Sequence, residues 1–424
     1  MTSAIIITFC SLLLIAYLFD LTFPKTKIPS VILLLLLGWI MKQVAIFSKI
    51  QLPDFTRVLT VTGSIGLLLI VLEATLELEL NKSKIPLIKK SFIGALLSMF
   101  ALAFLLAFIF SYFGSYSFKD CLVNAIPFCV VSSAIAIPSV KNLRPSDKEF
   151  IIYESSLSDI LSVLFFNFIV QNRTIGLGSF GNFGAQILVI IVVSFVATVG
   201  LSYLLNKIEH QIKFVPIILL VMLIYEISVV YNLPSLIFIM MFGLFLGNLN
   251  ELKRFKWIEF FRPNELDVEA QKFKSLTIEA AFLIRAIFFL FFGYSMETSE
   301  ILNTDTLMWS VTIVALIFIF RAVQIKLSNL PLKSLLFVSP RGLITILLFL
   351  SIAPAHRISI VNKALITQVI LLTTLIMMLA LIIIPQIQKR KQRKETTVKA
   401  SDPNNNLVEE ISNTNDISFE NCDA

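Results

Sequence analysis

Four polar side chains in one otherwise apolar stretch have the types and the spacing to hold a small cation or a proton. They are Glu154, Ser155, Ser158 and Asp159. At 100° per residue, Ser155 and Asp159 share one helix face, whereas Glu154 and Asp159 point about 140° apart. A carboxylate with hydroxyl and carbonyl oxygens beside it suits a small hard cation. The same carboxylate, partly removed from water, can carry a proton instead. We therefore expect one acid to bind ions and the other to face a cationic partner.

Two further stretches are expected to interrupt helices near this site. One contains the hydroxyls of Ser132 and Ser133 followed by Pro138, which removes a backbone donor and crowds the preceding turn. The other places Pro340 and Arg341 beside a glycine. Inside a membrane, irregular backbone is tolerated where it lines a cavity, so freed carbonyls and hydroxyls at mid-membrane suit an ion site. Packing serines and a kink without function are the alternative.

The elements that position these residues follow from composition. Of 424 residues, 57% are hydrophobic and only 15% are charged, and the mean hydropathy is +0.87. Soluble chains carry roughly 25% charged residues. Several apolar runs reach the ~20 residues that cross a bilayer as a helix, and they lack the alternation of barrel strands. The fold class is therefore an all-α polytopic membrane protein.

Hydropathy predicts about thirteen spans. Their approximate ranges are 3–23, 28–47, 58–80, 90–113, 118–141, 147–171, 183–205, 213–231, 234–249, 277–298, 305–326, 333–353 and 362–387. About 25 of the 35 Lys and Arg residues fall on one side, which predicts a cytoplasmic C-terminus and an outside N-terminus. This bias explains the net charge of +7 and implies no nucleic-acid partner.

Four regions are expected along the chain. Residues 1–249 form a first membrane half that includes the ion-binding spans, and residues 277–388 form a second half. Between them, residues 250–276 mix aromatic and charged side chains and predict a cytoplasmic amphipathic linker. Residues 389–424 are polar and predict a disordered cytoplasmic tail. Broken helices on both sides of the linker are typical of inverted-repeat transporters. No nucleotide-binding motif is present, so an ion gradient is expected to supply the energy.

Charges inside spans need a functional or structural reason, because burying them in lipid costs several kcal/mol. Besides the two acids above, the candidates include Glu73, Arg285, Arg321 and Arg341. Arg321 lies near the inner end of its predicted span, where its side chain is expected to pair with another of these charges or to reach the interface.

Taken together, these motifs resemble the monovalent cation:proton antiporters of the sodium/proton exchanger superfamily. The matching pieces are Glu154-Ser155-x-x-Ser158-Asp159, Arg341-Gly342, Leu72-Glu73-Ala74-x-Leu76-Glu77, Phe288–Gly293 and Ser132-Ser133-Ala134-Ile135-Ala136. The resemblance covers about residues 1–390. It implies an inverted-repeat antiporter fold, an elevator motion, a homodimer and a multi-pass protein of the cell membrane, here a bacterial inner membrane.

The resemblance also implies roles for individual residues. Asp159 resembles the aspartate that binds the cation and the proton, and Ser155 and Glu73 resemble further ligands of the ion. Glu154 resembles the acid that pairs with the late-span arginine, here Arg341. The cation and proton site is expected to include Asp159, Ser155, Ser158, Ser132, Ser133 and Glu73, and the structural ion pairs to include Glu154, Arg341 and Arg285.

One departure concerns stoichiometry. The family's asparagine before the aspartate is Ser158 here. Asp159 also has no second acid beside it. Branches with two adjacent acids move two protons per cation, so this chain resembles an electroneutral exchanger more closely. The transported species are expected to be protons and Na⁺, with K⁺ or Li⁺ as alternatives, and no cofactor or nucleotide is expected.

Three other functions fit the sequence less well. An ion-coupled symporter of organic solutes would need a roomier cavity than hydroxyls and single carboxylates suggest. A channel would need a carbonyl filter or a charged ring. An intramembrane enzyme is disfavoured, because the chain has only two histidines, His210 and His356, both expected in solvated loops, and no HExxH or GxSxG motif.

Overall fold

The structure is a computed structural model, and it describes most of the chain. The described residues are 2–26, 28–49, 56–140, 143–172, 176–207, 214–231, 233–253 and 263–400. Across these ranges the chain forms helices and connecting loops and no strand, which confirms the all-α prediction.

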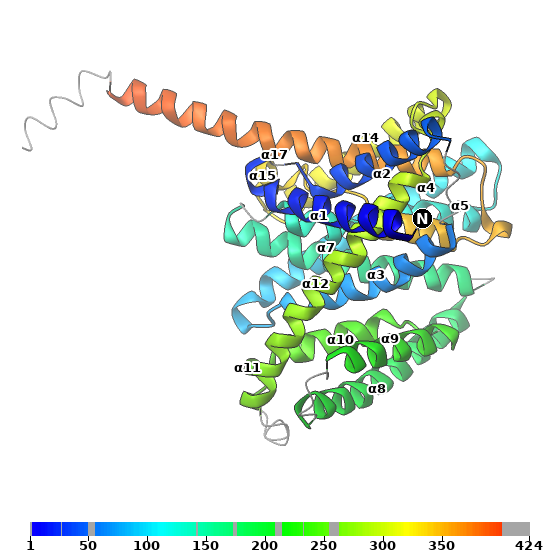
Figure 1. Ribbon diagram of the computed structural model, residues 1–424, viewed down its shortest axis with the longest axis vertical. Helices are drawn as coiled ribbons and strands as arrows, with labels where there is room; N and C mark the ends of the chain where they lie inside the picture. Colours follow the sequence, from blue (N-terminus) through cyan, green and yellow to red (C-terminus); the bar gives the residue numbers. More distant parts are fainter. Residues whose placement is uncertain are drawn as a thin grey trace, which may run out of the picture. The chain divides into compact units, whose positions relative to one another are not determined.

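The first part of the chain forms nine helical elements (Figure 1). They are α1 (Thr2–Thr26), α2 (Ser30–Phe47), α3 (Thr56–Glu77), η1 (Lys82–Lys84), α4 (Ile85–Gly114), α5 (Phe118–Cys129), α6 (Ser133–Ser139), α7 (Pro145–Gln171) and α8 (Leu177–Lys207). The later elements are α9 (Phe214–Val230), α10 (Leu236–Gly247), α11 (Leu249–Leu252), α12 (Pro263–Ser295), α13 (Thr298–Ile301), α14 (Thr304–Leu327), α15 (Leu332–Leu335), α16 (Leu343–Ser351), η3 (Pro354–His356) and α17 (Lys363–Ala400).

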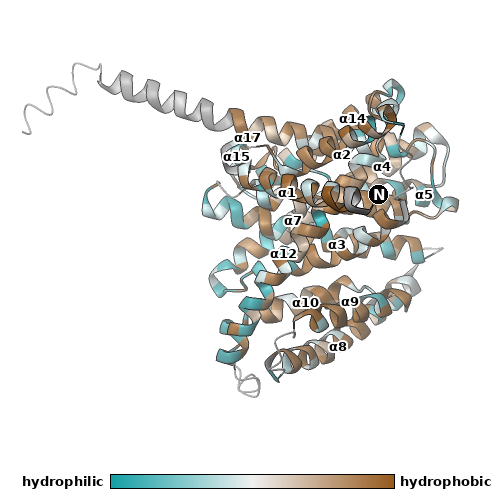
Figure 2. Ribbon diagram, in the orientation of Figure 1, coloured by the Kyte–Doolittle hydropathy of each residue, from teal (hydrophilic) through white to brown (hydrophobic). Residues whose placement is uncertain are grey.

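The helices have the length and composition of membrane spans. Among the described residues, seven helical stretches are long and apolar enough to cross a bilayer, and three shorter apolar helices accompany them. Hydrophobic residues run along most of these helices, while hydrophilic residues gather at helix ends and loops (Figure 2). Each of the thirteen predicted spans overlaps one helix or a pair of short helices, as expected for a polytopic membrane protein.

Two of the predicted spans are broken at mid-length. The span 118–141 consists of α5 and α6, and the span 333–353 consists of α15 and α16. The two breaks touch, because the Ser132 N–H donates to the Pro340 carbonyl at 2.9 Å. Pro138 does not cause the first break, contrary to expectation, and lies inside α6. The helix opens earlier, where tertiary partners take over the backbone hydrogen bonds that a helix would make.

The helices form two packing groups. In the first, α12 packs along α2 and α3, and α10 packs along α3 and α8. In the second, α4, α5 and α7 pack on one another, with α6 on α7, α14 on α4 and α16 on α5. Glycines bring α2 and α12 into backbone contact. A Cβ built on Gly38 would lie 2.2 Å from the Leu290 carbonyl oxygen, and one on Gly293 would lie 2.3 Å from the Leu35 carbonyl oxygen.

The predicted linker is partly the beginning of a membrane helix. Residues 254–262 lie outside the described part, but α12 begins at Pro263 and continues unbroken into the tenth predicted span. Leu266, Ala270 and Phe273 are buried at helical spacing, which gives this segment an apolar face. Its charged residues therefore lie beside an apolar face of this helix, and the cytoplasmic location of residues 250–276 stays a prediction.

The C-terminal tail also differs from the prediction in part. Helix α17 extends to Ala400, so residues 389–400 are helical, whereas they were expected to be disordered. The segment is rich in Lys, Arg, Gln and Glu, which are good helix formers. The rest of the predicted tail, residues 401–424, lies outside the described residues, as does His210.

Candidate ion-binding site

Asp159 lies on α7, beside the break between α5 and α6. It is only 1% exposed. Its Oδ2 accepts hydrogen bonds from the Ser133 backbone N–H, at 3.3 Å, and from the Ser133 hydroxyl. Its Oδ1 has no hydrogen-bond partner among the described residues. A buried carboxylate oxygen without a partner is costly, so this atom is positioned to hold a proton, a cation or a water molecule.

The surrounding serines play different roles. Ser132 is 2% exposed, and its hydroxyl has no partner within the described structure, so it is available beside the break. The Ser155 hydroxyl lies one turn from Asp159 and donates to the Ile151 carbonyl at 2.7 Å, which leaves its lone pairs able to accept or to coordinate. The Ser158 hydroxyl accepts a hydrogen bond from the Val131 N–H at 3.1 Å. Ser158 therefore ties α7 to the open backbone of the break.

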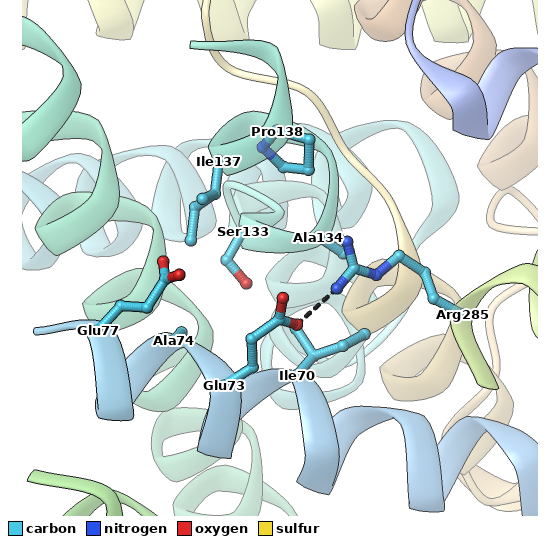
Figure 3. Close-up of a pocket in the computed structure, with 9 residues that line it drawn as sticks. All are labelled: Ile70, Glu73, Ala74, Glu77, Ser133, Ala134, Ile137, Pro138 and Arg285. Carbon is cyan, nitrogen blue, oxygen red and sulfur yellow. Dashed lines mark hydrogen bonds and ion pairs between the residues drawn. The ribbon is translucent and has the colours of Figure 1, made fainter. Parts of the chain in front are cut away.

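A small pocket lies beside this site, between α3, α6 and α12. It is lined by Ile70, Glu73, Ala74, Glu77, Ser133, Ala134, Ile137, Pro138 and Arg285 (Figure 3). Its volume is about 30 Å³, and a cavity needs roughly 10–15 Å³ to hold one water molecule. The pocket thus admits a small ion or one or two waters. Ser133 is shared between the pocket and Asp159.

Glu73 and Arg285 are joined across this pocket. The Arg285 Nη2 donates to the Glu73 Oε2 at 2.6 Å (Figure 3). Their side chains are 20% and 15% exposed, so the pair is partly shielded from solvent. The predicted ion ligand Glu73 is therefore in contact with the predicted cationic partner Arg285.

Glu154 pairs with Arg321, which corrects the expected pairing with Arg341. The Glu154 Oε1 accepts hydrogen bonds from the Arg321 guanidinium and from the Gln324 amide. Arg321 is 1% exposed, so of its two expected environments it takes the pair with another charge and does not reach the interface. Its other nitrogens donate to the carbonyls of Leu335 at 3.3 Å and Val338 at 3.2 Å. The pair therefore connects α7 and α14 to the backbone of the second break.

Arg341 instead binds backbone oxygens at the crossing. Its Nε donates to the Phe128 carbonyl at 2.6 Å, and its Nη1 donates to the Ser339 carbonyl at 2.9 Å and hydroxyl at 2.8 Å. Phe128 lies in the last turn of α5, where carbonyls lack helical partners and carry partial negative charge. Arg341 thus neutralises the end of a half-helix. This explains how an arginine that is 2% exposed is tolerated without a carboxylate partner.

Two contributors were missed by sequence reasoning. Gln324 lies three residues after Arg321 on α14, so helical spacing places both on one face and could have indicated a shared partner. Thr373 on α17 accepts the Arg341 backbone N–H at 3.2 Å. A threonine in an apolar span gives no comparable signal, because such hydroxyls commonly bond to their own helix.

Buried acids and arginines around two crossing, interrupted helices are the arrangement expected of a polytopic ion transporter. Comparison with known families agrees: the family described as "Sodium/hydrogen exchanger, transmembrane" matches residues 10–388. The chain belongs to this family, whose members are transporters. A search of curated proteins found no match.

Two solved structures share the fold. The sodium proton antiporter MjNhaP1 from Methanocaldococcus jannaschii at pH 8 is 18% identical, with a TM-score of 0.63, over 90% of this chain and 96% of that one. A second structure of MjNhaP1, from electron microscopy, is 17% identical with a TM-score of 0.63, over 90% of this chain and 95% of that one. The expected antiporter fold is thereby confirmed.

Proposed function

We propose that the protein exchanges protons for a monovalent cation, with Na⁺ preferred and K⁺ or Li⁺ as alternatives. Asp159 binds the proton and the cation in competition. One observation carries this proposal: a buried carboxylate with one unpartnered oxygen lies where two broken helices cross. A proton or a cation can each satisfy that oxygen, and occupancy by one excludes the other.

The remaining ligands would come from the oxygens around Asp159. The hydroxyl of Ser132, which has no partner among the described residues, and the lone pairs of Ser155 are candidates on the break and on α7. Ser133 already donates to the carboxylate, and its hydroxyl oxygen can coordinate a cation in turn. Ser158 contributes by fixing the break at Val131.

Glu73 takes part only if its present partner moves. Arg285 occupies the Glu73 carboxylate in this structure, so the guanidinium competes with a cation for the same oxygens. We infer that cation entry through the pocket displaces Arg285 from Glu73. The competition would keep Glu73 paired whenever no cation is bound, which limits the cost of a charge in low dielectric.

The absence of a second acid next to Asp159 supports an electroneutral exchange of one proton for one cation. The two packing groups would move relative to each other in alternating access, with Asp159 on the group that contains α7. The proposed setting is a homodimer in a bacterial inner membrane with a cytoplasmic C-terminus. The proposed substrates are ions, as in other members of the family, and no cofactor is proposed.

The alternative function, symport of an organic solute, is less well supported. The pocket beside Asp159 has a volume of about 30 Å³, whereas sites for organic ligands typically span roughly 300–1,000 Å³. Apart from Arg285, the pocket offers carboxylates, one hydroxyl and apolar side chains. Such a lining suits a small cation better than a solute.

The test is cation-induced dequenching of a pH-sensitive dye in proteoliposomes on addition of Na⁺, K⁺ or Li⁺. The wild type should respond to at least one cation, and Asp159→Asn should abolish the response. Asp147→Asn is a matched control on the same helix, because buried Asp147 accepts from Ser334 at 2.9 Å and lies outside the site. Full exchange by the Asp159 variant would contradict the assignment, and a flat wild-type response to every cation between about pH 6 and 9 would favour the symporter.

A further inference from the structure

The ends of α5 and α16 that lie away from the crossing are held together by a histidine and an aspartate. His356, in η3 just after α16, places its Nδ1 2.6 Å from the Oδ1 of Asp120 in the first turn of α5. Their side chains are 30% and 27% exposed. His356 is therefore paired and half-buried, whereas a solvated loop histidine was expected.

Other hydrogen bonds fix both partners. The Asn124 amide, which is fully buried one turn along α5, donates to the carbonyls of His356 at 2.7 Å and Asp120 at 2.8 Å. The Ser117 hydroxyl donates to the Asp120 Oδ2 at 2.6 Å. The Tyr116 hydroxyl lies 2.7 Å from the Ser359 hydroxyl, so the loop after α16 is tied to the start of α5 at a second, uncharged point.

The same two half-helices are also tied at their other end. There, the Arg341 guanidinium donates to the Phe128 carbonyl of α5. Arg341 immediately precedes Gly342, the residue before α16. Since α5 and α16 are fastened at both ends, their relative position sets where the broken segment at Ser132 and Ser133 lies. Of these contacts between α5 and α16, the one at His356 can be strengthened or weakened by a proton, because imidazole changes charge between about pH 5 and 8.

We propose that His356 and Asp120 form a proton-sensitive clasp that positions α5 against α16 and so maintains the geometry of the ion site. This inference rests on the proposed exchange function. At acid pH the imidazolium and the carboxylate form a charge-assisted hydrogen bond, which is roughly twice as strong as a neutral one. As pH rises the charge of the imidazolium is lost, and the clasp weakens.

Few other charged groups face the clasp. Lys119 on α5 lies near the Asp120 carboxylate, and the thiol of Cys121 also interacts with it. Arg357 follows His356 in the chain, and its Nε donates to the Ile352 carbonyl at 3.0 Å. Lys119 acts on Asp120, and neither Lys119 nor Arg357 changes charge over the pH range in which imidazole titrates. The pH response of the clasp is therefore assigned to His356.

The first test measures thermal stability in detergent without transported cations, for the wild type and for His356→Gln. The wild type should unfold at a higher temperature than the variant at pH 6, and the difference should shrink by pH 8.5. Tyr116→Phe is the control, because it removes an uncharged tie of the same loop and should give a difference independent of pH. A pH-independent effect of His356→Gln would overturn the clasp, whether or not the protein transports ions.

The second test asks whether the clasp positions the ion site. In proteoliposomes, the ratio of cation KM between His356→Gln and the wild type should be about two- to fivefold at pH 6 and approach one at pH 8.5. Asp120→Asn combined with His356→Gln should add nothing to the acid-pH effect of His356→Gln alone. Equal KM values at both pH values would overturn the positioning role. The effect of Asp159→Asn on exchange tests the proposed function, whereas the clasp is judged from these KM ratios alone.

Discussion

The buried pair Glu154–Arg321 offers the sharpest test of how the site is supported. We consider Glu154→Gln and Arg321→Met, which each remove one charge with little change of volume. Both residues are about 1% exposed, so each single change leaves an uncompensated charge in the protein interior. Breaking such a pair from one side costs about 3–5 kcal/mol of unfolding free energy. Arg321→Met also removes its bonds to two backbone carbonyls, worth about 0.5–1.5 kcal/mol each.

The double variant should recover part of this loss. With both charges gone, no unpaired ion remains, and exchange of a buried pair for neutral groups is often nearly neutral. We therefore expect the double variant to be destabilised by less than the sum of the singles, with a coupling energy of about 1–3 kcal/mol. The measurement is equilibrium unfolding in mixed micelles of a mild detergent and SDS. The fraction of SDS is raised stepwise, and tryptophan fluorescence reports the unfolded fraction.

A second cycle separates the two possible partners of Glu154. Glu154→Gln should be close to additive with Arg341→Met, because Arg341 donates to Phe128 and Ser339 and makes no ion pair with Glu154. If coupling to Arg341 exceeded coupling to Arg321, the pairing described above would be wrong, and the pairing expected from the family resemblance would stand.

Three further predictions concern other parts of the fold. Gly342→Ala should reduce exchange severalfold in the dye assay, because its Cβ would lie 2.6 Å from the Ser132 hydroxyl; wild-type rates would show that the crossing yields easily. Gly293→Ala should destabilise the protein by about 1–3 kcal/mol in the unfolding assay, because its Cβ would meet a backbone oxygen of α2 at 2.3 Å, and an unchanged midpoint would contradict that contact. The hydrogen bond and charge of Lys84 lower the pKa of Glu79, so this pair should stabilise the fold above about pH 4.5 and lose its effect as pH falls through the lowered pKa; an effect of Glu79→Gln on stability that did not change with pH would refute this.

The fold and the neighbourhood of Asp159 were accessible from the sequence for definite reasons. Long apolar runs specify membrane helices, because lipid leaves few other ways to satisfy the backbone. Ser132 and Ser133 beside a proline, and Pro340 beside Arg341, indicated two interruptions, and both are present. Helical spacing correctly separated Glu154 from Asp159, since these acids contact different elements in the structure.

What the sequence could not supply was the choice of partners across elements. Three arginines could have faced Glu154, and the packing of both α14 and α7 on α4 brings Arg321 to it. Arg341 required no carboxylate, because carbonyls at the end of a half-helix satisfy it. The position of the first break was misplaced toward Pro138, since the Val131 and Ser132 N–H groups find tertiary acceptors that no local rule predicts.

The glycine contact between α2 and α12 has a mechanical consequence. At Gly38 and Gly293 the backbones of α2 and α12 are in direct contact, so the two helices cannot slide past each other there without separating. Arg285 lies on α12, which also packs along α3, the helix that carries Glu73. If the two packing groups move relative to each other as proposed, the contact surface between α3 and the elements α6 and α7 must change. The pocket beside Ser133 lies at that surface, so its lining residues would be among those whose contacts change during transport.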